Sequence, residues 1–216
     1  MNTLEKMDAF FNARAGSYDN HMLRDLCLEE FYCETAIQFA GLKETDRLLD
    51  LGCGTGLELE RLFAKCPSLN VTGIDVSDAM LSVLKAKYPG KNLHLICGSY
   101  FDLTLEGGAY DYALSTYSLH HFSKDQKRNL YKKIHKALKP SGIFVLGDYT
   151  VKTQEEEELH LSESLRLCGD NLPAGSYHYD TPFTRETETI LLNGAGFHDI
   201  RIAREWESTT LFAAVK

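Results

Sequence analysis

The sequence contains no cysteine pair at the C-x-x-C spacing, no long apolar run and no basic leader. Its scattered cysteines exclude a zinc ribbon and a disulfide framework and favour buried free thiols. The apolar runs, such as 143–146, are far too short to cross a membrane. The first ten residues have neither a basic start nor a following apolar stretch. We therefore expect no signal peptide, no membrane partner and a cytoplasmic location.

The chain also has fewer basic than acidic residues. The chain has 23 Lys and Arg against 31 Asp and Glu, a formal net charge of -8 that would repel a phosphate backbone. The most basic stretch, 123–139, places its cations on the outer side of an amphipathic helix pattern, where a solvated helix face is the simpler interpretation. We expect no nucleic-acid partner, and composition leaves a monomer or a homodimer open.

A chain of 216 residues is long enough for one large domain, which we expect to span residues 1–216. Strand-like and helix-like segments alternate from about residue 45, which indicates a parallel sheet covered by helices on both faces. The last two strands follow each other so closely that they must be antiparallel. The expected strands are 47–52, 70–75, 92–97, 110–116, 143–149, 199–208 and 209–216.

Local signals place several helix starts and turns. Ser77 is expected to cap one helix, and Ser123 with Gln126 three residues later forms a capping-box pattern. The KPSG stretch before the fifth strand predicts a turn. Residues 1–43 predict a helical cover, and residues 150–183 interrupt the alternation as a lid-like insertion.

The stretch LLDLGCGTG, residues 48–56, has three glycines in five positions between a strand and a helix. Such a turn lies where doubly wound sheets bind ligands, and its amides favour an anionic group. The dinucleotide fingerprint would need glycine at position 57, which is Leu57. Asp50, two residues before the first glycine, would repel a pyrophosphate but suits a ligand that carries an ammonium group.

A second acid closes the second strand. Asp75 stands 19 residues after Gly56, where a carboxylate can accept hydrogen bonds from ribose hydroxyls. A ligand that uses both acids carries an amino-acid end and a nucleoside end. S-adenosylmethionine has this chemistry, and we expect it, with S-adenosylhomocysteine as its product, to occupy the glycine turn.

These motifs resemble those of the class I S-adenosylmethionine-dependent methyltransferases, in particular the small-molecule group with a type 11/12 methyltransferase domain. LLDLGCGTG resembles the first motif, GIDVSDAML the second and YDYALSTYSLHHF the fourth. The resemblance implies a Rossmann-like, doubly wound α/β fold with a seven-stranded sheet in the order 3-2-1-4-5-7-6. Its strands are mostly parallel, with an antiparallel last strand. Ser141 stands where the family commonly has glycine, a conservative change for a turn.

The resemblance also implies a set of cofactor-binding residues. Ser99 occupies the place of a common acidic residue, so adenine recognition is left between Ser99, the backbone of Tyr100 and Asp102. The implied cofactor-binding set is Asp50, Gly52, Cys53, Gly54, Gly56, Asp75, Val76, Met80, Ser99, Tyr100 and Ser115.

Methyl transfer needs alignment of a nucleophile with an already activated methyl group, and a general base only for some acceptors. Tyr18 resembles the tyrosine that this group places over the cofactor from an amino-terminal helix, with packing as the alternative. His120 follows the fourth strand as a base candidate, with packing or capping of the histidine pair as the alternative. Asp148 closes the fifth strand toward the same pocket, with backbone hydrogen bonding as the alternative. These three are the catalytic candidates.

The insertion offers Tyr177, His178, Tyr179 and Phe183 as an aromatic lid or, alternatively, as a hydrophobic seam. Histidines and acids show no ligand-like spacing along the chain, so no metal is expected. The expected activity is methyl transfer to an O, N, S or C atom of a small molecule. The alternatives are a protein or nucleic-acid methyltransferase and a non-catalytic S-adenosylmethionine-binding module.

Overall fold

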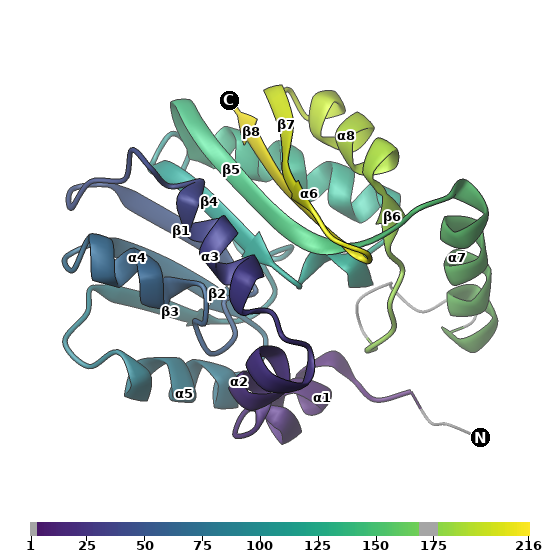
Figure 1. The fold of residues 1–216 in the computed structure, drawn as a ribbon, viewed down its shortest axis with the longest axis horizontal. Helices are drawn as coiled ribbons and strands as arrows, with labels where there is room; N and C mark the ends of the chain where they lie inside the picture. The colour runs from purple at the N-terminus through teal and green to yellow at the C-terminus, as the bar shows by residue number, and fades with distance from the viewer. Residues whose placement is uncertain (1–3, 169–176) are drawn as a thin grey trace.

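The computed structural model describes residues 4–168 and 177–216, and its centre is a twisted sheet in the order β3-β2-β1-β4-β5-β8-β7 (Figure 1). Neighbouring strands are parallel except β8, which is antiparallel to both β5 and β7. The strands are β1 (Arg47–Leu51), β2 (Asn70–Asp75), β3 (Leu93–Cys97), β4 (Tyr110–Thr116), β5 (Leu138–Val151), β6 (Phe183–Thr184), β7 (His198–Glu205) and β8 (Thr209–Val215). The predicted order of seven strands is confirmed.

The short β6 adds an eighth strand that the sequence pattern does not predict. It pairs with β5 in parallel through Phe183 opposite Thr150. Two residues are too few to show an alternating pattern, so this strand depends on its partner.

Helices cover both faces of the sheet. They are α1 (Met7–Arg14), α2 (Tyr18–Asn20), the π-helical η1 (His21–Asp25), α3 (Glu29–Ile37), α4 (Leu59–Lys65), α5 (Asp78–Lys87), the 3-10 turn η2 (Leu119–His121), α6 (Lys124–Ala137), α7 (Gln154–Cys168) and α8 (Arg185–Gly194). Leu48 packs with α4 and α5 on one face, while Leu49 packs with α6 and α8 on the other. Successive strand residues point to opposite faces, which explains why continuous apolar runs form the central strands.

The helix caps expected from the sequence are confirmed. Ser77 Oγ accepts a hydrogen bond from the Met80 N–H at 3.1 Å. Ser123 and Gln126 form the reciprocal capping box at the start of α6. Each cap satisfies backbone donors that would otherwise have no partner at the first turn of its helix.

The predicted turn at residues 139–142 is wrong. These residues belong to β5, which runs from Leu138 to Val151 without interruption by a loop. Its register against β4 shifts between Tyr110 and Tyr112, and Ser141 has a φ of 63°. Turn-forming residues therefore make an irregularity inside a long strand. Because Ser141 sits in the left-handed region, its replacement of glycine is not conservative.

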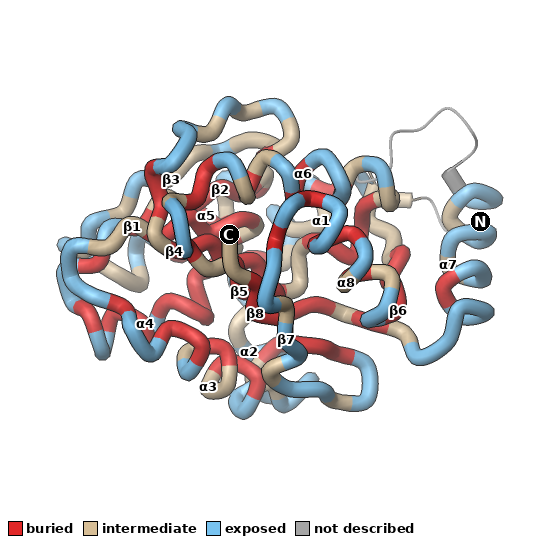
Figure 2. The backbone as a smooth tube through the Cα atoms, turned by 90° about the horizontal axis from the view of Figure 1, so that it is seen from above, coloured by how far each residue is buried: buried red, intermediate tan, exposed pale blue. Residues whose placement is uncertain are grey.

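The amino-terminal helices α1, α2 and η1 lie beside the carboxyl ends of β1 and β2, with α1 against α5 (Figure 1). Helix α7 lies at the end of the sheet beside β6, where Glu157 accepts the Thr184 N–H at 2.9 Å, and is otherwise largely exposed (Figure 2). It belongs to the expected insertion 150–183, of which residues 169–176 lie outside the described part. Among the described helices, none is long and apolar enough to cross a membrane.

Candidate functional site

The three glycines after β1 serve two structural purposes. All have positive φ, 72° at Gly52, 45° at Gly54 and 71° at Gly56. A Cβ on Gly52 would lie 2.0 Å from Ser118 Oγ, so this glycine permits a close approach within the protein. A Cβ on Gly54 would face open space, with the Tyr18 ring 4.0 Å away. Gly54 therefore exposes backbone to a cavity, whereas Gly52 makes room for a neighbouring side chain.

Asp75, at the end of β2, ties the glycine turn to the second strand. Its Oδ2 accepts a hydrogen bond from the Gly54 N–H at 2.9 Å, and its Oδ1 accepts one from the Ser77 N–H at 2.8 Å. Burial raises the pKa of Asp75, an effect that these backbone donors oppose. The carboxylate holds the turn in place and still lines a cavity.

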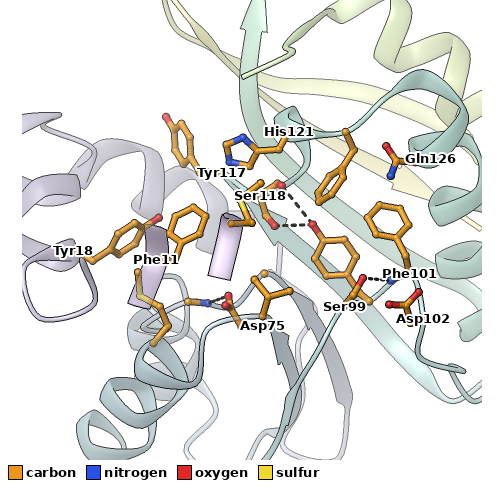
Figure 3. Close-up of a pocket in the computed structure, with 17 residues that line it drawn as sticks. Phe11, Tyr18, Asp75, Ser99, Phe101, Asp102, Tyr117, Ser118, His121 and Gln126 are labelled. Atoms are coloured by element: carbon orange, nitrogen blue, oxygen red, sulfur yellow. Dashed lines mark hydrogen bonds between the residues drawn. The ribbon is translucent and has the colours of Figure 1, made fainter. Parts of the chain in front are cut away.

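That cavity, the first cavity, has a volume of about 410 Å³ and lies between the glycine turn and the segment after β3 (Figure 3). Seven residues of the predicted cofactor set line it: Gly52, Gly54, Asp75, Val76, Met80, Ser99 and Tyr100. Asp102 lines it as well, so all three adenine candidates border the same space. Four members of the set do not line it: Asp50, Cys53, Gly56 and Ser115. Ser115 instead donates its hydroxyl to the Leu51 carbonyl at 2.8 Å.

Asp50 lies inside the sheet beneath the turn rather than on the cavity wall. Its side chain is buried, and its carboxyl hydrogen-bonds with the Glu58 carboxyl when one of the two is protonated, with no other hydrogen-bond partner among the described residues. Burial raises the pKa of Asp50 well above its usual value, and the neighbouring carboxyl of Glu58 raises it further. Burial also raises the pKa of Glu58, to about 7. Two unneutralised acids therefore share a dry region next to the glycine turn.

Tyr18 forms the wall of the first cavity on the side of α2. The adjacent Asp19 anchors this segment, because its carboxylate accepts the Thr55 hydroxyl at 2.5 Å and pairs with the Lys87 ammonium at 2.5 Å. Burial raises the pKa of Tyr18, and the Glu58 carboxylate adds to the effect. Its phenol therefore stays protonated at neutral pH and can donate a hydrogen bond, but it is a poor base.

A second cavity, of about 680 Å³, adjoins the first. Its walls come from the amino-terminal helices, the turn after β4, the end of β5 and the segment before β6. Phe11, Tyr18, Tyr117 and His121 line both cavities. The side chains of the first cavity and this shared wall are drawn in Figure 3.

Tyr117, in the shared wall, adopts a strained backbone. Its φ is 46°, and its N–H donates to the Gly147 carbonyl at 2.9 Å. Its hydroxyl lies 2.8 Å from Thr209 Oγ1, which holds the ring between the cavities. Bulky residues in the left-handed region are uncommon and concentrate at functional sites.

His120 and Asp148 form a buried pair beside the second cavity. His120 Nδ1 lies 2.5 Å from Asp148 Oδ1. Asp148 also accepts backbone hydrogen bonds from Leu119 and Tyr149, both at 3.0 Å. Although burial opposes ionisation of Asp148, His120 holds the pKa of this carboxyl below its usual value. Burial likewise opposes the charge on His120, but Asp148 more than offsets it and raises the pKa of His120.

A second aspartate faces the histidine pair from the opposite side. Asp180 Oδ1 lies 3.5 Å from His120 Nε2 and 3.2 Å from His121 Nδ1. Burial lowers the pKa of His121, and so does the neighbouring His120. His178 stacks on Phe10 at a centroid distance of 3.5 Å, and burial lowers its pKa to about 4.

The four residues expected to form an aromatic lid lie in different parts of the structure. Of these four, only His178 lines the second cavity. Tyr179 donates its hydroxyl to Glu163 at 3.0 Å, and Phe183 is buried beneath α6 near Lys127. Asp180 was not predicted as a site residue, because the aromatic side chains around it are the more conspicuous feature of this segment. Glu58 was not predicted either, although an acid two residues after the glycine turn is a visible signal.

Comparison with known proteins adds independent evidence. Residues 48–142 match the family model described as a methyltransferase domain. The malonyl-[acyl-carrier protein] O-methyltransferase of Priestia megaterium is 29% identical over 133 residues, covering 60% of this chain and 47% of the relative. The chain thus spans about half the length of that relative. The carboxy-S-adenosyl-L-methionine synthase of Nautilia profundicola is 23% identical over 235 residues, covering 99% of this chain and 96% of the relative.

A solved structure shows the same fold. Human N-acetylserotonin methyltransferase, in complex with SAM, superimposes with a TM-score of 0.64 at 17% identity. The match covers 97% of this chain and 55% of that chain. The likeness extends over the sheet and its helices, so the two cavities stand on a fold known from solved methyltransferases.

Proposed function

We propose that this chain, which carries a class I S-adenosylmethionine-dependent methyltransferase domain, transfers a methyl group from S-adenosylmethionine to a small-molecule acceptor. One observation carries the proposal: two cavities share the wall formed by Phe11, Tyr18, Tyr117 and His121. The first has the glycine turn and Asp75, and the second has polar and ionisable side chains. A donor and an acceptor in these cavities would meet at the shared wall.

The residues around the first cavity fit S-adenosylmethionine. Asp50 and Glu58 form a buried pair of carboxyls beneath the glycine turn, and an ammonium group bound nearby would favour their charged forms. Gly54 leaves space that a side chain would fill, and Asp75 presents carboxylate oxygens at the cavity. When bound, the sulfonium of S-adenosylmethionine supplies a methyl group that is already activated. The chain must therefore bind, orient and exclude water rather than create a leaving group.

The second cavity supports a small, polar acceptor. Its volume of about 680 Å³ lies within the range of small-molecule sites. Arg14, His120, His178 and Asp180 contribute charged or ionisable groups to its walls. Among the relatives, the malonyl-[acyl-carrier protein] enzyme is an O-methyltransferase by name, which supports methyl transfer to an oxygen atom, although the acceptor in that name is attached to a carrier protein.

We propose that Tyr18, in the shared wall, and His120, elsewhere in the second cavity, face the acceptor and that Asp148 positions His120. Tyr18 and His120 line the second cavity, whereas Asp148 does not. The Asp148 carboxylate holds His120 Nδ1, so that Nε2 is directed away from it toward Asp180. Asp148 thus sets the ring orientation without touching the acceptor.

Binding of S-adenosylhomocysteine, measured by calorimetry, tests the cofactor site. Asp75→Ala should weaken binding at least tenfold, because it removes both the ribose acceptor and the tie to Gly54. Asp78→Ala removes an exposed aspartate three residues away and should leave the affinity within twofold. Equal affinity in wild type and Asp75→Ala would contradict the proposal.

Gly54→Ala provides a second test with a close control. It should weaken S-adenosylhomocysteine binding, because Cβ enters the first cavity. Gly90→Ala carries the same kind of backbone strain, since Gly90 has a φ of 77° and open space around its Cβ. The control should lose similar stability and no affinity. Release of S-adenosylhomocysteine from a panel of small acceptors then tests turnover, and binding without turnover would favour a non-catalytic module.

A further inference from the structure

Three side chains from distant parts of the chain converge beside the second cavity. His120 and His121 follow β4, and Asp180 precedes β6. Their ligand atoms all lie within 4.8 Å of one another. We propose that His120, His121 and Asp180 bind a divalent first-row transition metal ion. The proposal deepens the proposed function, because it assigns a cation to the acceptor side of the same site.

Two of the three separations between these atoms are close to those of a metal site, and the third is at most 4.8 Å. Zinc binds imidazole nitrogen and carboxylate oxygen at about 2.0–2.2 Å, so two ligands in a tetrahedral or octahedral arrangement lie about 3.0–3.4 Å apart. The observed separations from Asp180 Oδ1 are 3.2 Å to His121 Nδ1 and 3.5 Å to His120 Nε2. Small shifts of side chains would place one ion in contact with all three atoms.

The shared oxygen has the two histidines as its neighbours. Asp180 Oδ1 is shielded from solvent, and the nitrogens of His121 and His120 that face it at 3.2 and 3.5 Å form ion pairs with it only when those rings are protonated. A carboxylate oxygen in this state is costly unless a cation or a donor satisfies it. A metal ion held between Asp180 and the two imidazoles would supply that charge.

Asp148 prepares His120 for this role. It lies 2.5 Å from Nδ1 of His120, so a proton on Nδ1 leaves the lone pair of Nε2 on the side of Asp180. Imidazole ligands of metals usually donate their second nitrogen to a carboxylate or carbonyl, which sets the tautomer and the ring orientation. The buried Asp148 is such a partner.

His121 requires one local change. Its Nδ1 lies 3.1 Å from the Tyr179 carbonyl, and ligation would replace that hydrogen bond and release any proton on this nitrogen. Two imidazoles and one carboxylate leave coordination positions open. Because all three residues line the second cavity, those positions face the acceptor, and an oxygen or nitrogen of the acceptor could occupy one.

Metal binding is measured directly, without turnover. After dialysis against a chelator, the full chain is titrated with Co²⁺, followed by visible absorption, and with Zn²⁺, followed by calorimetry. We expect one ion per chain. Asp180→Asn should lower the affinity at least tenfold, and Asp148→Asn about 10–100-fold through its effect on His120. His121→Asn removes a second of the proposed ligands and should also lower the affinity.

The chain offers a matched control. His198 Nδ1 lies 3.1 Å from Asp199, so it is also an imidazole beside a carboxylate, but on the exposed surface. His198→Gln should leave the stoichiometry and affinity of Co²⁺ unchanged. Thermal unfolding of every variant verifies that the fold is intact.

Two results would overturn the metal proposal: no stoichiometric uptake by wild type, or uptake that is equal in wild type, Asp180→Asn and His121→Asn. Either result, with intact S-adenosylhomocysteine binding, would leave the proposed methyl transfer standing and show that Asp180 forms only an ion cluster with the histidines. If the wild-type protein did not bind S-adenosylhomocysteine, the proposed function itself would be refuted.

Discussion

Asp50 and Glu58 place two carboxyl groups in one dry region beneath the glycine turn, with only part of their hydrogen-bonding capacity used. Glu58 Oε2 accepts the Thr116 hydroxyl at 3.4 Å, while Glu58 Oε1 and both oxygens of Asp50 have no partner in the described chain other than the two carboxyls themselves. Burial disfavours their charged forms. A bound ammonium group would favour the charged forms, so proton binding and cofactor binding oppose each other here.

This opposition predicts a pH-dependent affinity. The pKa of Glu58 is raised to about 7 in the free protein, and a cationic ligand should lower it. Between the two pKa values the free protein holds more protons than the complex, so binding releases protons and the affinity rises with pH until about 7. Calorimetry of S-adenosylmethionine in buffers of different ionisation enthalpy measures the release. Glu58→Gln should reduce both the release and the slope, and an unchanged slope would contradict the assignment.

Ser141 stores backbone strain that glycine would remove. Its φ of 63° lies in the left-handed region, and its side chain is exposed. Left-handed backbone costs a non-glycine residue about 1–2 kcal/mol, while glycine loses about 0.5–1 kcal/mol through its greater freedom when unfolded. Ser141→Gly should therefore raise the free energy of unfolding by about 0.5–1 kcal/mol in urea denaturation. Ser141→Ala keeps the strain and should show no gain.

At the scale of elements, a buried ion pair joins α6 to α8. The ammonium of Lys127 pairs with Glu188 Oε1, and Glu188 Oε2 accepts the Tyr131 hydroxyl at 2.7 Å. Both charged side chains are almost completely shielded from solvent. Lys127 also lies 4.6 Å from the centre of the Phe183 ring, so the same pair supports β6.

Breaking this pair from one side should be costly. Glu188→Leu leaves a buried ammonium without a counterion and should lower the free energy of unfolding by about 3–5 kcal/mol. Adding Lys127→Met removes the unpaired charge and should recover most of the loss. Chemical denaturation of the two single variants and the double variant measures the coupling. Additive losses would show that the two side chains act independently.

At the scale of the whole molecule, the two cavities lie at the edge where β1, β2 and β4 end. Their walls join the glycine turn, the amino-terminal helices and the segment before β6. Lys6, before α1, and Tyr177, in the segment before β6, form a single antiparallel bridge. A ligand at the shared wall would therefore contact parts of the chain that are far apart in sequence.

Such a ligand should stabilise the whole fold. S-adenosylhomocysteine at 100 times its dissociation constant should raise the free energy of unfolding by about 2.7 kcal/mol, since it binds the native state only. Thermal unfolding over a ligand titration measures this gain. Asp75→Ala should lose at least about half of it at the same concentrations, whereas Asp78→Ala should retain it. A gain that is equal in all three proteins would place the ligand elsewhere.

Local sequence signals determined the positions of the seven main strands, the two predicted helix caps and the glycine turn. Each depends on residues within a few positions of one another, where periodicity and backbone preference act directly. The strand order and part of the lining of the first cavity were predicted from the resemblance of these motifs to a family. Asp75 and Met80, for instance, follow a recognisable strand end and helix start.

Tertiary structure alone decided how distant side chains meet. It buried Asp50 beside Glu58 instead of on the cavity wall, and it brought Asp180 against His120 and His121, which lie 60 and 59 residues earlier in the chain. It also extended β5 through the predicted turn at 139–142. These outcomes depend on packing and strand pairing between separate segments, which no local pattern of residues encodes.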